Sequence, residues 1–203
     1  MEAETRLEDL LAAIAPKYRK AWRRHIESLA AGVQRDLAPV ADLSEATWQR
    51  LKQNILGQVD QRQPARGWPQ ARDLLHEARA FQYLQRQGCE EIAFSAPTML
   101  AKSPDLIARQ GFRRILCEVK TIRLTADDAL PAAFARKLLT RLRDAEKQLR
   151  ADDDTSAQRL VYVILDRDGA DGRPELVAEI TAILRRSMPA GLDFVLDTGA
   201  CAQ

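Results

Sequence analysis

The sequence predicts an α/β fold: a mixed β-sheet flanked by helices and preceded by an α-helical N-terminal region. Three observations predict it. Residues 1–65 repeat apolar side chains at helical spacing, and residues 104–122 form two apolar runs separated by a turn. Residues 131–197 then alternate helical and strand-like patterns. A hairpin followed by alternating strands and helices is typical of a mixed sheet.

The composition excludes several classes of protein. The chain has 203 residues with 46% hydrophobic and 30% charged residues, which is ordinary for a globular domain with a small appended one. The net charge of +2 does not by itself indicate a nucleic-acid partner. No stretch approaches the ~18 apolar residues that a membrane span needs.

The compartment follows from the cysteines and the N-terminus. Cys89, Cys117 and Cys201 are odd in number and widely spaced, so they form neither a zinc pattern nor a disulfide framework. The charged start, MEAETRLEDL, argues against a secretory leader. We therefore expect a cytoplasmic protein, and the richness in alanine and arginine favours a bacterial source.

Three helices are predicted in the N-terminal region. Apolar residues recur at helical spacing over residues 5–15 and 18–33. Asp42 and Glu45 resemble a capping box that opens a third helix, from Glu45 to Val59.

A Pro/Gly-rich segment at residues 61–70 predicts a linker. We therefore expect a helical N-terminal region over residues 1–66, serving as a substrate clamp or for dimerisation. Residues 67–203 would form the second domain.

The second domain is predicted to follow the order helix, three strands, helix, strand, helix, strand. The expected helices are 71–87, 131–150 and 175–187, and the expected strands are 90–96, 104–109, 112–122, 159–166 and 192–197. Gly88 ends the first of these helices, and Pro131 begins the second. The strongly apolar, β-branched strand 159–166 should lie inside the sheet.

Ionisable residues stand where the predicted hairpin strands meet the rest of the sheet. If residues 110–111 form the turn, Asp105 lies opposite Leu116, and Glu118 is its diagonal neighbour on the same face, ~7–8 Å away. Lys120 is the next residue on that face. The two carboxylates could then reach one divalent ion. The same residues could instead form an ordinary polar strand end that meets water, with Glu118 and Lys120 as a surface ion pair.

A third carboxylate, Glu77, falls within the apolar stripe of helix 71–87. A carboxylate packed toward a sheet needs a partner, because burying an unpaired charge costs several kcal/mol. Glu77 could instead sit at the edge of the stripe and reach solvent. Its neighbour His76 is expected at the surface.

These residues together resemble the motif of the PD-(D/E)XK nuclease superfamily, which has the restriction-endonuclease-like fold. The residues that carry the resemblance are, in order, Glu77, Pro104-Asp105 and Glu118-Val119-Lys120. The resemblance covers roughly residues 70–197 and implies an αβββαβ core. The motif itself is short, and its residues also recur by chance. The N-terminal 65 residues lie outside the resemblance, and no subfamily is assigned.

The resemblance implies a metal-dependent nuclease that hydrolyses phosphodiester bonds, with DNA favoured over RNA. Glu77, Asp105 and Glu118 would be ligands of Mg²⁺ or Mn²⁺, and the backbone carbonyl of Val119 would add another. Lys120 would orient the attacking water or stabilise the charge that develops at the phosphate. The catalytic residues implied are therefore Glu77, Asp105, Glu118 and Lys120.

Basic residues on two helices are candidates for nucleic-acid binding. They are Arg19, Lys20, Arg23 and Arg24 in the N-terminal region, and Lys137, Arg141 and Gln148 on helix 131–150. The spacing of Tyr18 and Trp22 between the first four favours core packing for those two aromatics. A solvated helix face with i,i+4 ion pairs is the alternative for helix 131–150.

Two other functions remain open. The same fold could hold nucleic acid without cleaving it, or the helical N-terminus could act as an interaction module, including in a homodimer. The acidic run at residues 152–154 is expected to be a solvated loop.

Overall fold

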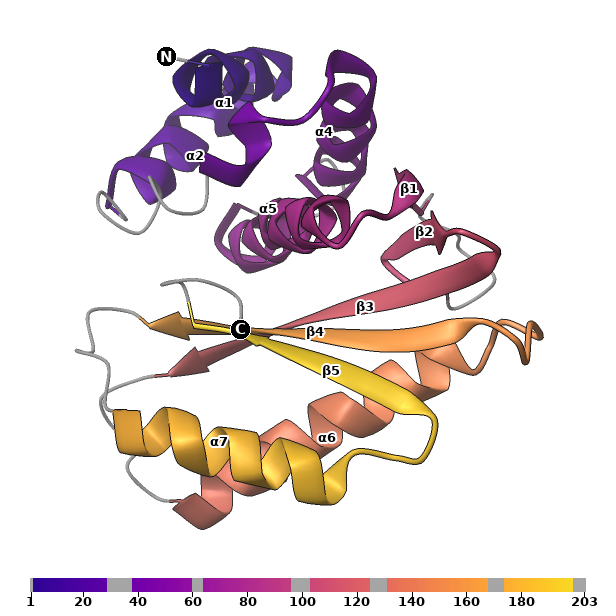
Figure 1. The fold of residues 1–203 in the computed structure, drawn as a ribbon. Coiled ribbons are helices and arrows are strands. Elements are labelled where there is room, and N and C mark those ends of the chain that lie inside the picture. The colour runs from indigo at the N-terminus through magenta and orange to yellow at the C-terminus, as the bar shows by residue number, and fades with distance from the viewer. Residues whose placement is uncertain are drawn as a thin grey trace. The chain divides into compact units, whose positions relative to one another are not determined.

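The structure is a computed structural model of the chain. It describes residues 1–203 except 1, 29–37, 60–63, 96–102, 125–130, 168–173 and 199–203. The chain divides into two compact units, residues 1–82 and residues 83–203 (Figure 1). In the part of the chain that is described, no helix is both long enough and apolar enough to cross a membrane.

The first unit is helical, as predicted. Its helices are α1 (Glu2–Ala13), α2 (Pro16–Ser28), α4 (Glu45–Val59) and α5 (Pro64–Arg86), of which the last continues into the second unit. The expected linker at residues 61–70 is wrong from residue 64 onward, because Pro64 begins α5. Proline suits a first helical position, where its missing N–H has no intrahelical partner to lose. The domain boundary expected after residue 66 therefore falls inside a helix.

Polar contacts join α1 to α4 in this unit. The Asp9 carboxylate accepts hydrogen bonds from Lys52 Nζ at 2.8 Å and from Trp48 Nε1 at 2.9 Å. These bonds, that of Lys52 first, lower the pKa of Asp9. The largest fully buried apolar side chains in this unit are Leu10, Leu11, Ile14, Trp22, Trp48, Leu51 and Ile55. The burial of Trp22 confirms its expected place in a core.

Helix α4 begins at the predicted residue but with a different cap. Ser44 Oγ accepts a hydrogen bond from the Thr47 backbone N–H at 3.2 Å, so Ser44 is the N-cap. The capping box predicted from Asp42 and Glu45 is wrong. Asp42 instead accepts a hydrogen bond from Gln82 Nε2 at 2.8 Å.

The second unit is built on a five-stranded mixed sheet. Its strands are β1 (Glu90–Phe94), β2 (Leu106–Gln110), β3 (Arg113–Leu124), β4 (Gln158–Arg167) and β5 (Leu192–Asp197), in that spatial order. Strands β1, β2 and β3 pair antiparallel, whereas β3, β4 and β5 pair parallel. Together with α5, α6 (Pro131–Leu149) and α7 (Pro174–Ser187), they confirm the α/β class and the predicted αβββαβ order.

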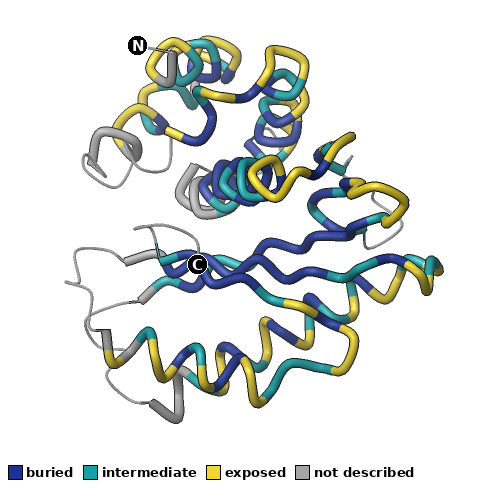
Figure 2. The backbone as a smooth tube through the Cα atoms, in the orientation of Figure 1, coloured by how far each residue is buried: buried dark blue, intermediate teal, exposed yellow. Residues whose placement is uncertain are grey.

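Helices α6 and α7 cover the same face of this sheet (Figure 1). The crossovers β3-α6-β4 and β4-α7-β5 step across the sheet in one direction, so crossovers of the same hand place both helices on one side. Helix α6 buries Leu138, Leu142, Ala145 and Leu149 in the core beneath the sheet. The strands are largely buried, while exposed residues follow the outer sides of both helices (Figure 2).

The opposite face of β4 carries a buried tyrosine. Tyr162 Oη donates a hydrogen bond to the Asp197 carboxylate at 2.7 Å, and both residues are buried. The Tyr83 ring lies 5.4 Å from the Tyr162 ring, centroid to centroid. Burial raises the pKa of Tyr83. At β4, the sheet face opposite α6 is therefore lined by aromatic residues, whereas the face that packs on α6 is aliphatic.

The β2–β3 hairpin has a different register from the predicted one. Gln110 pairs with Arg113, so Gly111-Phe112 forms the two-residue turn, with Gly111 at φ 58°. Glycine adopts this left-handed conformation without strain, which makes it the first turn residue. The turn predicted at residues 110–111 is therefore wrong by one residue, and this shifts the pairing of the two strands by two positions. Because side chains alternate with period two, a shift of two positions keeps every side chain on its expected face.

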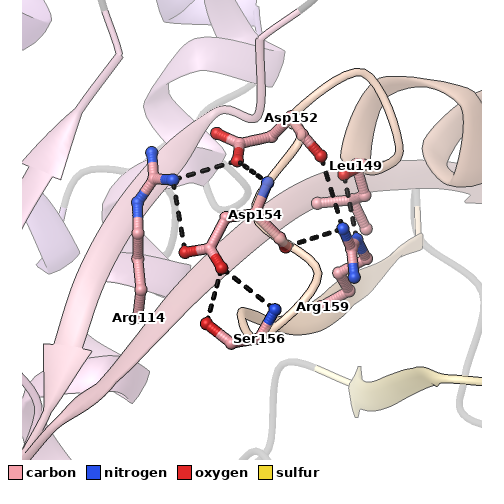
Figure 3. A network of polar contacts seen from close by, with 6 residues as sticks. All are labelled: Arg114, Leu149, Asp152, Asp154, Ser156 and Arg159. Atoms are coloured by element: carbon pink, nitrogen blue, oxygen red, sulfur yellow. Dashed lines mark hydrogen bonds and ion pairs between the residues drawn. The ribbon is translucent and has the colours of Figure 1, made fainter.

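The acidic run after α6 is fastened to β3. Arg114 donates to the Asp152 carboxylate at 2.9 Å and lies 3.7 Å from the Asp154 carboxylate (Figure 3). Asp154 also accepts hydrogen bonds from the hydroxyl and the backbone N–H of Ser156, and the hydroxyl bond is the main cause of its lowered pKa. The expectation of a simple solvated loop is therefore wrong for Asp152 and Asp154.

Arg159 holds the C-terminal end of α6. Its guanidinium donates to the backbone carbonyl of Leu149 at 3.1 Å, of Asp154 at 2.9 Å and of Asp152 at 3.4 Å (Figure 3). Carbonyls at a helix end lack intrahelical donors, so a cation there supplies both hydrogen bonds and charge. This side chain therefore ties the helix, the loop and β4 together.

Replacing Arg159 with methionine is expected to lower the free energy of unfolding by about 2–3 kcal/mol, because several charged hydrogen bonds are lost. Urea denaturation should show a lower midpoint with an unchanged slope. Arg143→Met, at an exposed position of α6, is the matched control and should change stability by less than about 0.5 kcal/mol. Equal effects of the two substitutions would show that the Arg159 contacts add little.

Candidate active site

Asp105 and Glu118 lie together where β2 begins. Leu106 pairs with Cys117, and one further step of this register places Asp105 opposite Glu118. The Asp105 carboxylate accepts a hydrogen bond from the Val119 backbone N–H at 2.7 Å. Glu118 is fully buried and Asp105 is half-buried. The two acids are therefore direct cross-strand neighbours rather than the diagonal neighbours that were predicted.

Pro104 explains why the ladder stops here. The same register places Pro104 opposite Val119, and proline has no N–H to donate. In an extended strand the N–H and C=O of one residue point to the same side. Because the Val119 N–H points to Asp105, its carbonyl also points to that side and receives no ladder bond from Pro104. This direction suits the predicted role of the carbonyl as a metal ligand, which stays a prediction.

Lys120 lies between Glu118 and helix α6. Its Nζ donates to Glu118 Oε1 and, at 3.1 Å, to Gln148 Oε1. The Lys120 side chain is only 14% exposed, so the ammonium group is held away from bulk water. The structure thus brings Asp105, Glu118, Lys120 and Gln148 into one group, which we call the acid–lysine cluster. The contact between Gln148 and Lys120 was not foreseen from the sequence.

Burial of Glu118 has a large electrostatic effect. Loss of solvation, with the negative charge of Asp105 second, raises the pKa of Glu118 to about 8, against the opposing influence of Lys120. Its Oε2 is buried and accepts no hydrogen bond from a described residue. Near neutral pH this raised pKa keeps a proton on Glu118, beside the Asp105 carboxylate.

This arrangement fits a divalent cation. The cluster offers two carboxylates, and the Val119 carbonyl lies between them and Lys120 in the chain; these are the hard oxygen donors that Mg²⁺ and Mn²⁺ prefer. The unpaired Oε2 of Glu118 and the neighbouring charge of Asp105 would both be satisfied by a cation. Within the described ranges, no three His, Cys, Asp or Glu side chains group as a metal site, so the second unit supplies two of the three predicted acidic ligands.

Glu77, the third predicted ligand, lies on α5 in the first unit. It is buried at 7% exposure, as its place in the apolar stripe predicts. His76 beside it is fully buried, so its expected surface position is wrong; the buried side of α5 is wider than the apolar stripe and also includes Arg72. The grouping of Glu77 with the acid–lysine cluster spans two units and stays a prediction.

The predicted nucleic-acid residues of α6 lie on one side of that helix. At 100° per residue, Lys137, Arg141 and Gln148 fall within an arc of about 40°. Lys137 Nζ donates to the Arg123 backbone carbonyl on β3 at 3.3 Å, and Arg141 is exposed. Asp144 lies close to the same arc. Two cations therefore continue along α6 from the residue that contacts Lys120.

The four basic residues of α2 are used in two different ways. Arg19 donates to backbone carbonyls at the end of α1 at 2.9 and 3.1 Å. Arg23 makes two hydrogen bonds of 3.0 Å to the Glu8 carboxylate and thereby lowers the pKa of Glu8. Lys20 and Arg24 are exposed. Arg19 and Arg23 thus join α2 to α1, and any nucleic-acid contact of this helix would depend first on Lys20 and Arg24.

Comparison with known proteins adds little to this geometry. A scan against protein-family models found no match for the chain, and a search of curated proteins found none either. Among solved structures, the chain is similar to the structure of Pyrococcus furiosus SfsA in complex with Ca²⁺. That similarity has 13% identity and a TM-score of 0.28, and it covers 65% of this chain and 56% of that one. At this TM-score it supports no conclusion about function.

Proposed function

We propose that this protein is a divalent-metal-dependent nuclease that hydrolyses phosphodiester bonds, with DNA favoured over RNA as substrate. The observation that carries the proposal is the buried Glu118 beside Asp105, with one unpaired oxygen and an ammonium group alongside. Such a pair costs stability, and strongly perturbed carboxylates with a specific charge partner are typical of active sites.

Each residue of the acid–lysine cluster has a role in this proposal. Asp105, Glu118 and the Val119 carbonyl would hold Mg²⁺ or Mn²⁺, with Glu77 as a further predicted ligand. When bound, the ion would polarise a phosphoryl oxygen and lower the pKa of a bound water. Glu118 must first release its proton.

Lys120 would act beside the metal ligands. An ammonium group has three donors, and the contacts with Glu118 and Gln148 use two of them. In this proposal the third donor meets a phosphoryl oxygen or the attacking water. The neutral Gln148 side chain accepts a hydrogen bond from Lys120 Nζ and adds no negative charge beside it.

A cleavage assay tests the proposal. The full chain is incubated with plasmid, single-stranded DNA and RNA in Mg²⁺, Mn²⁺ or EDTA. We expect cleavage only when Mg²⁺ or Mn²⁺ is present. We expect Asp105→Asn to slow this cleavage by about 10²–10³-fold. Asparagine keeps the acceptor for the Val119 N–H but removes the charge, so titration calorimetry should also show weaker Mn²⁺ binding. Asp153→Asn, at an exposed loop position, is the matched control.

Two results would contradict the proposal in different ways. Cleavage that persists in EDTA, or that survives Asp105→Asn combined with Lys120→Ala, would remove the cluster from the chemistry. Tight nucleic-acid binding without cleavage under every metal condition would instead identify a catalytically silent binding module.

A further inference from the structure

The tip of the β2–β3 hairpin presents one aromatic side chain to solvent. Phe112 has a relative exposure of 107% and is the exposed large hydrophobic residue among those described. Turns of this kind favour Gly, Asn or Asp, so phenylalanine gains nothing here from packing or from backbone geometry. Single apolar residues are common on protein surfaces, and the surroundings of Phe112 therefore decide its meaning.

The segment of chain around Phe112 is basic, and the arginine next to it in the sequence is exposed. Residues 109–114 read RQGFRR, with three arginines and no acid. Arg109 forms an ion pair with Glu91, and Arg114 is bound to Asp152 in the loop after α6. Arg113 is exposed and adjoins Phe112 in the chain. An exposed ring beside an exposed guanidinium suits a nucleobase and its phosphate, because the base stacks on the ring while the cation meets the phosphate.

The hairpin holds this tip rigidly. Its strands pair through five consecutive positions, up to Gln110 and Arg113 at the turn. Gln110 Nε2 also donates to the Gln87 backbone carbonyl at 2.8 Å. The ion pairs of Arg109 and Arg114 anchor both strands to neighbouring segments. The backbone that carries Phe112 is therefore held on both sides of the turn, so binding has to order only the side chain itself.

The tip and the acid–lysine cluster lie on the same hairpin. Phe112 precedes Glu118 by six residues, and a strand advances ~3.3 Å per residue, so about 20 Å separates them. Stacked nucleotides advance ~3.4 Å each along a strand. A nucleic acid that contacts both sites would therefore bridge about 20 Å, which takes about six nucleotides when they are stacked and fewer when the backbone is extended.

We propose that Phe112 and Arg113 form a second nucleic-acid contact, at most about six nucleotides from the scissile phosphate. Phe112 stacks on a base, and Arg113 binds the neighbouring phosphate. Stacking of this kind requires an unpaired base, so the substrate has a single-stranded segment on this side. This inference rests on the proposed function for the position of the cleavage site.

Binding of single-stranded oligonucleotides tests the inference. Measurements use fluorescence anisotropy in a Glu118→Gln background, which prevents cleavage. Phe112→Ala is expected to weaken binding of a 12-nucleotide strand by about 5- to 100-fold. A 2-nucleotide strand is too short to reach both contacts even when it is extended, so the loss should be much smaller for a strand confined to the cluster. Because Phe112 is fully exposed, Phe112→Ala should melt within about 2 °C of the parent.

Three matched variants separate base stacking from plain apolar contact and from charge. Phe112→Trp should keep the affinity, and its added fluorescence should be quenched by single-stranded DNA. Phe112→Leu keeps an apolar side chain without a ring and should behave like Phe112→Ala. Arg113→Gln should reduce the salt dependence of binding by about one phosphate contact.

The outcomes distinguish this inference from the proposed function. Unchanged affinity of Phe112→Ala for the 12-nucleotide strand, with metal-dependent cleavage intact in the wild type, overturns the tip contact alone. Rescue by Phe112→Leu, with a change in oligomeric state by light scattering, would assign the tip to a protein partner and also overturn it. Strand binding that depends on Phe112 without cleavage under any metal condition keeps the tip contact and rejects the nuclease.

Discussion

Replacing Glu118 with glutamine is expected to raise the free energy of unfolding of the metal-free protein by about 3–5 kcal/mol at pH 8.5. At pH 5 the same substitution should leave it almost unchanged. Glutamine resembles the protonated acid in shape and charge. The substitution therefore matters only where the wild-type carboxyl is forced to ionise in its buried position.

The sign follows from the raised pKa. Folded Glu118 keeps its proton up to about pH 8, whereas an unfolded glutamate loses it near pH 4.5. Between these values the folded protein binds more protons than the unfolded chain, so stability falls as the pH rises from about 4.5 to 8. Below that window the protonated acid costs nothing, and above it the cost is constant.

Chemical denaturation at several pH values, in EDTA, measures this slope. The wild type should lose stability across the window, and Glu118→Gln should lose much less. Glu179→Gln, at an exposed position of α7, is the control and should follow the wild type. Mn²⁺ at pH 8.5 should restore stability to the wild type but not to Glu118→Gln. Parallel curves for wild type and Glu118→Gln would show that Glu118 is ionised at ordinary pH.

Replacing Lys120 with methionine is expected to lower kcat by about 10²–10³-fold while Mn²⁺ still binds at pH 8. Methionine keeps much of the buried stem but removes the donors to Glu118 and Gln148. The ammonium group competes with a divalent cation for the charge of Glu118. Its removal should therefore preserve metal binding at a pH where Glu118 is ionised, even though the phosphate loses its donor.

Catalysis and metal binding of the Lys120→Met variant are measured separately to test this prediction. Titration calorimetry reports Mn²⁺ affinity, and single-turnover cleavage reports the chemical step. Lys147→Met, at an exposed position of α6, is the matched control and should leave both unchanged. Loss of Mn²⁺ binding in Lys120→Met would mean that Lys120 maintains the shape of the cluster rather than contacting substrate.

The order of helices and strands could be predicted because it depends on local patterns. The helix Glu45–Val59 and the strand Leu192–Asp197 have the predicted bounds. The face of the hairpin that carries Glu118 and Lys120 was also predictable. A strand has a period of two, so an error of two positions in register does not move a side chain to the other face.

The register itself could not be predicted from the hydrophobic pattern. Gln110-Gly111 and Gly111-Phe112 are both two-residue turns that keep the same apolar face inward. The choice depends on where glycine takes its positive φ and on contacts outside the hairpin, such as the hydrogen bond from Gln110 to the Gln87 carbonyl. That choice moved Asp105 from a diagonal to a direct neighbour of Glu118.

Contacts between distant segments were also beyond sequence patterns. Gln148 could be placed near the site, but its hydrogen bond to Lys120 depends on how α6 crosses β3. The acidic run after α6 was predicted to be solvated because its partners could not be recognised in the sequence. Arg114 is far from this run in the chain, and Arg159 belongs to the following strand β4. His76 was misplaced because amphipathic periodicity marks apolar residues and does not identify polar residues that are buried with them.

The early end of β2 has a consequence for solution behaviour. Within the described ranges, the backbone pairing of β3 with β2 ends at Cys117, while its pairing with β4 continues for seven more residues, to Leu124. Unpaired strand edges promote aggregation, and charged side chains on them oppose it. A variant that neutralises Lys120 is therefore expected to aggregate at lower concentrations than the wild type.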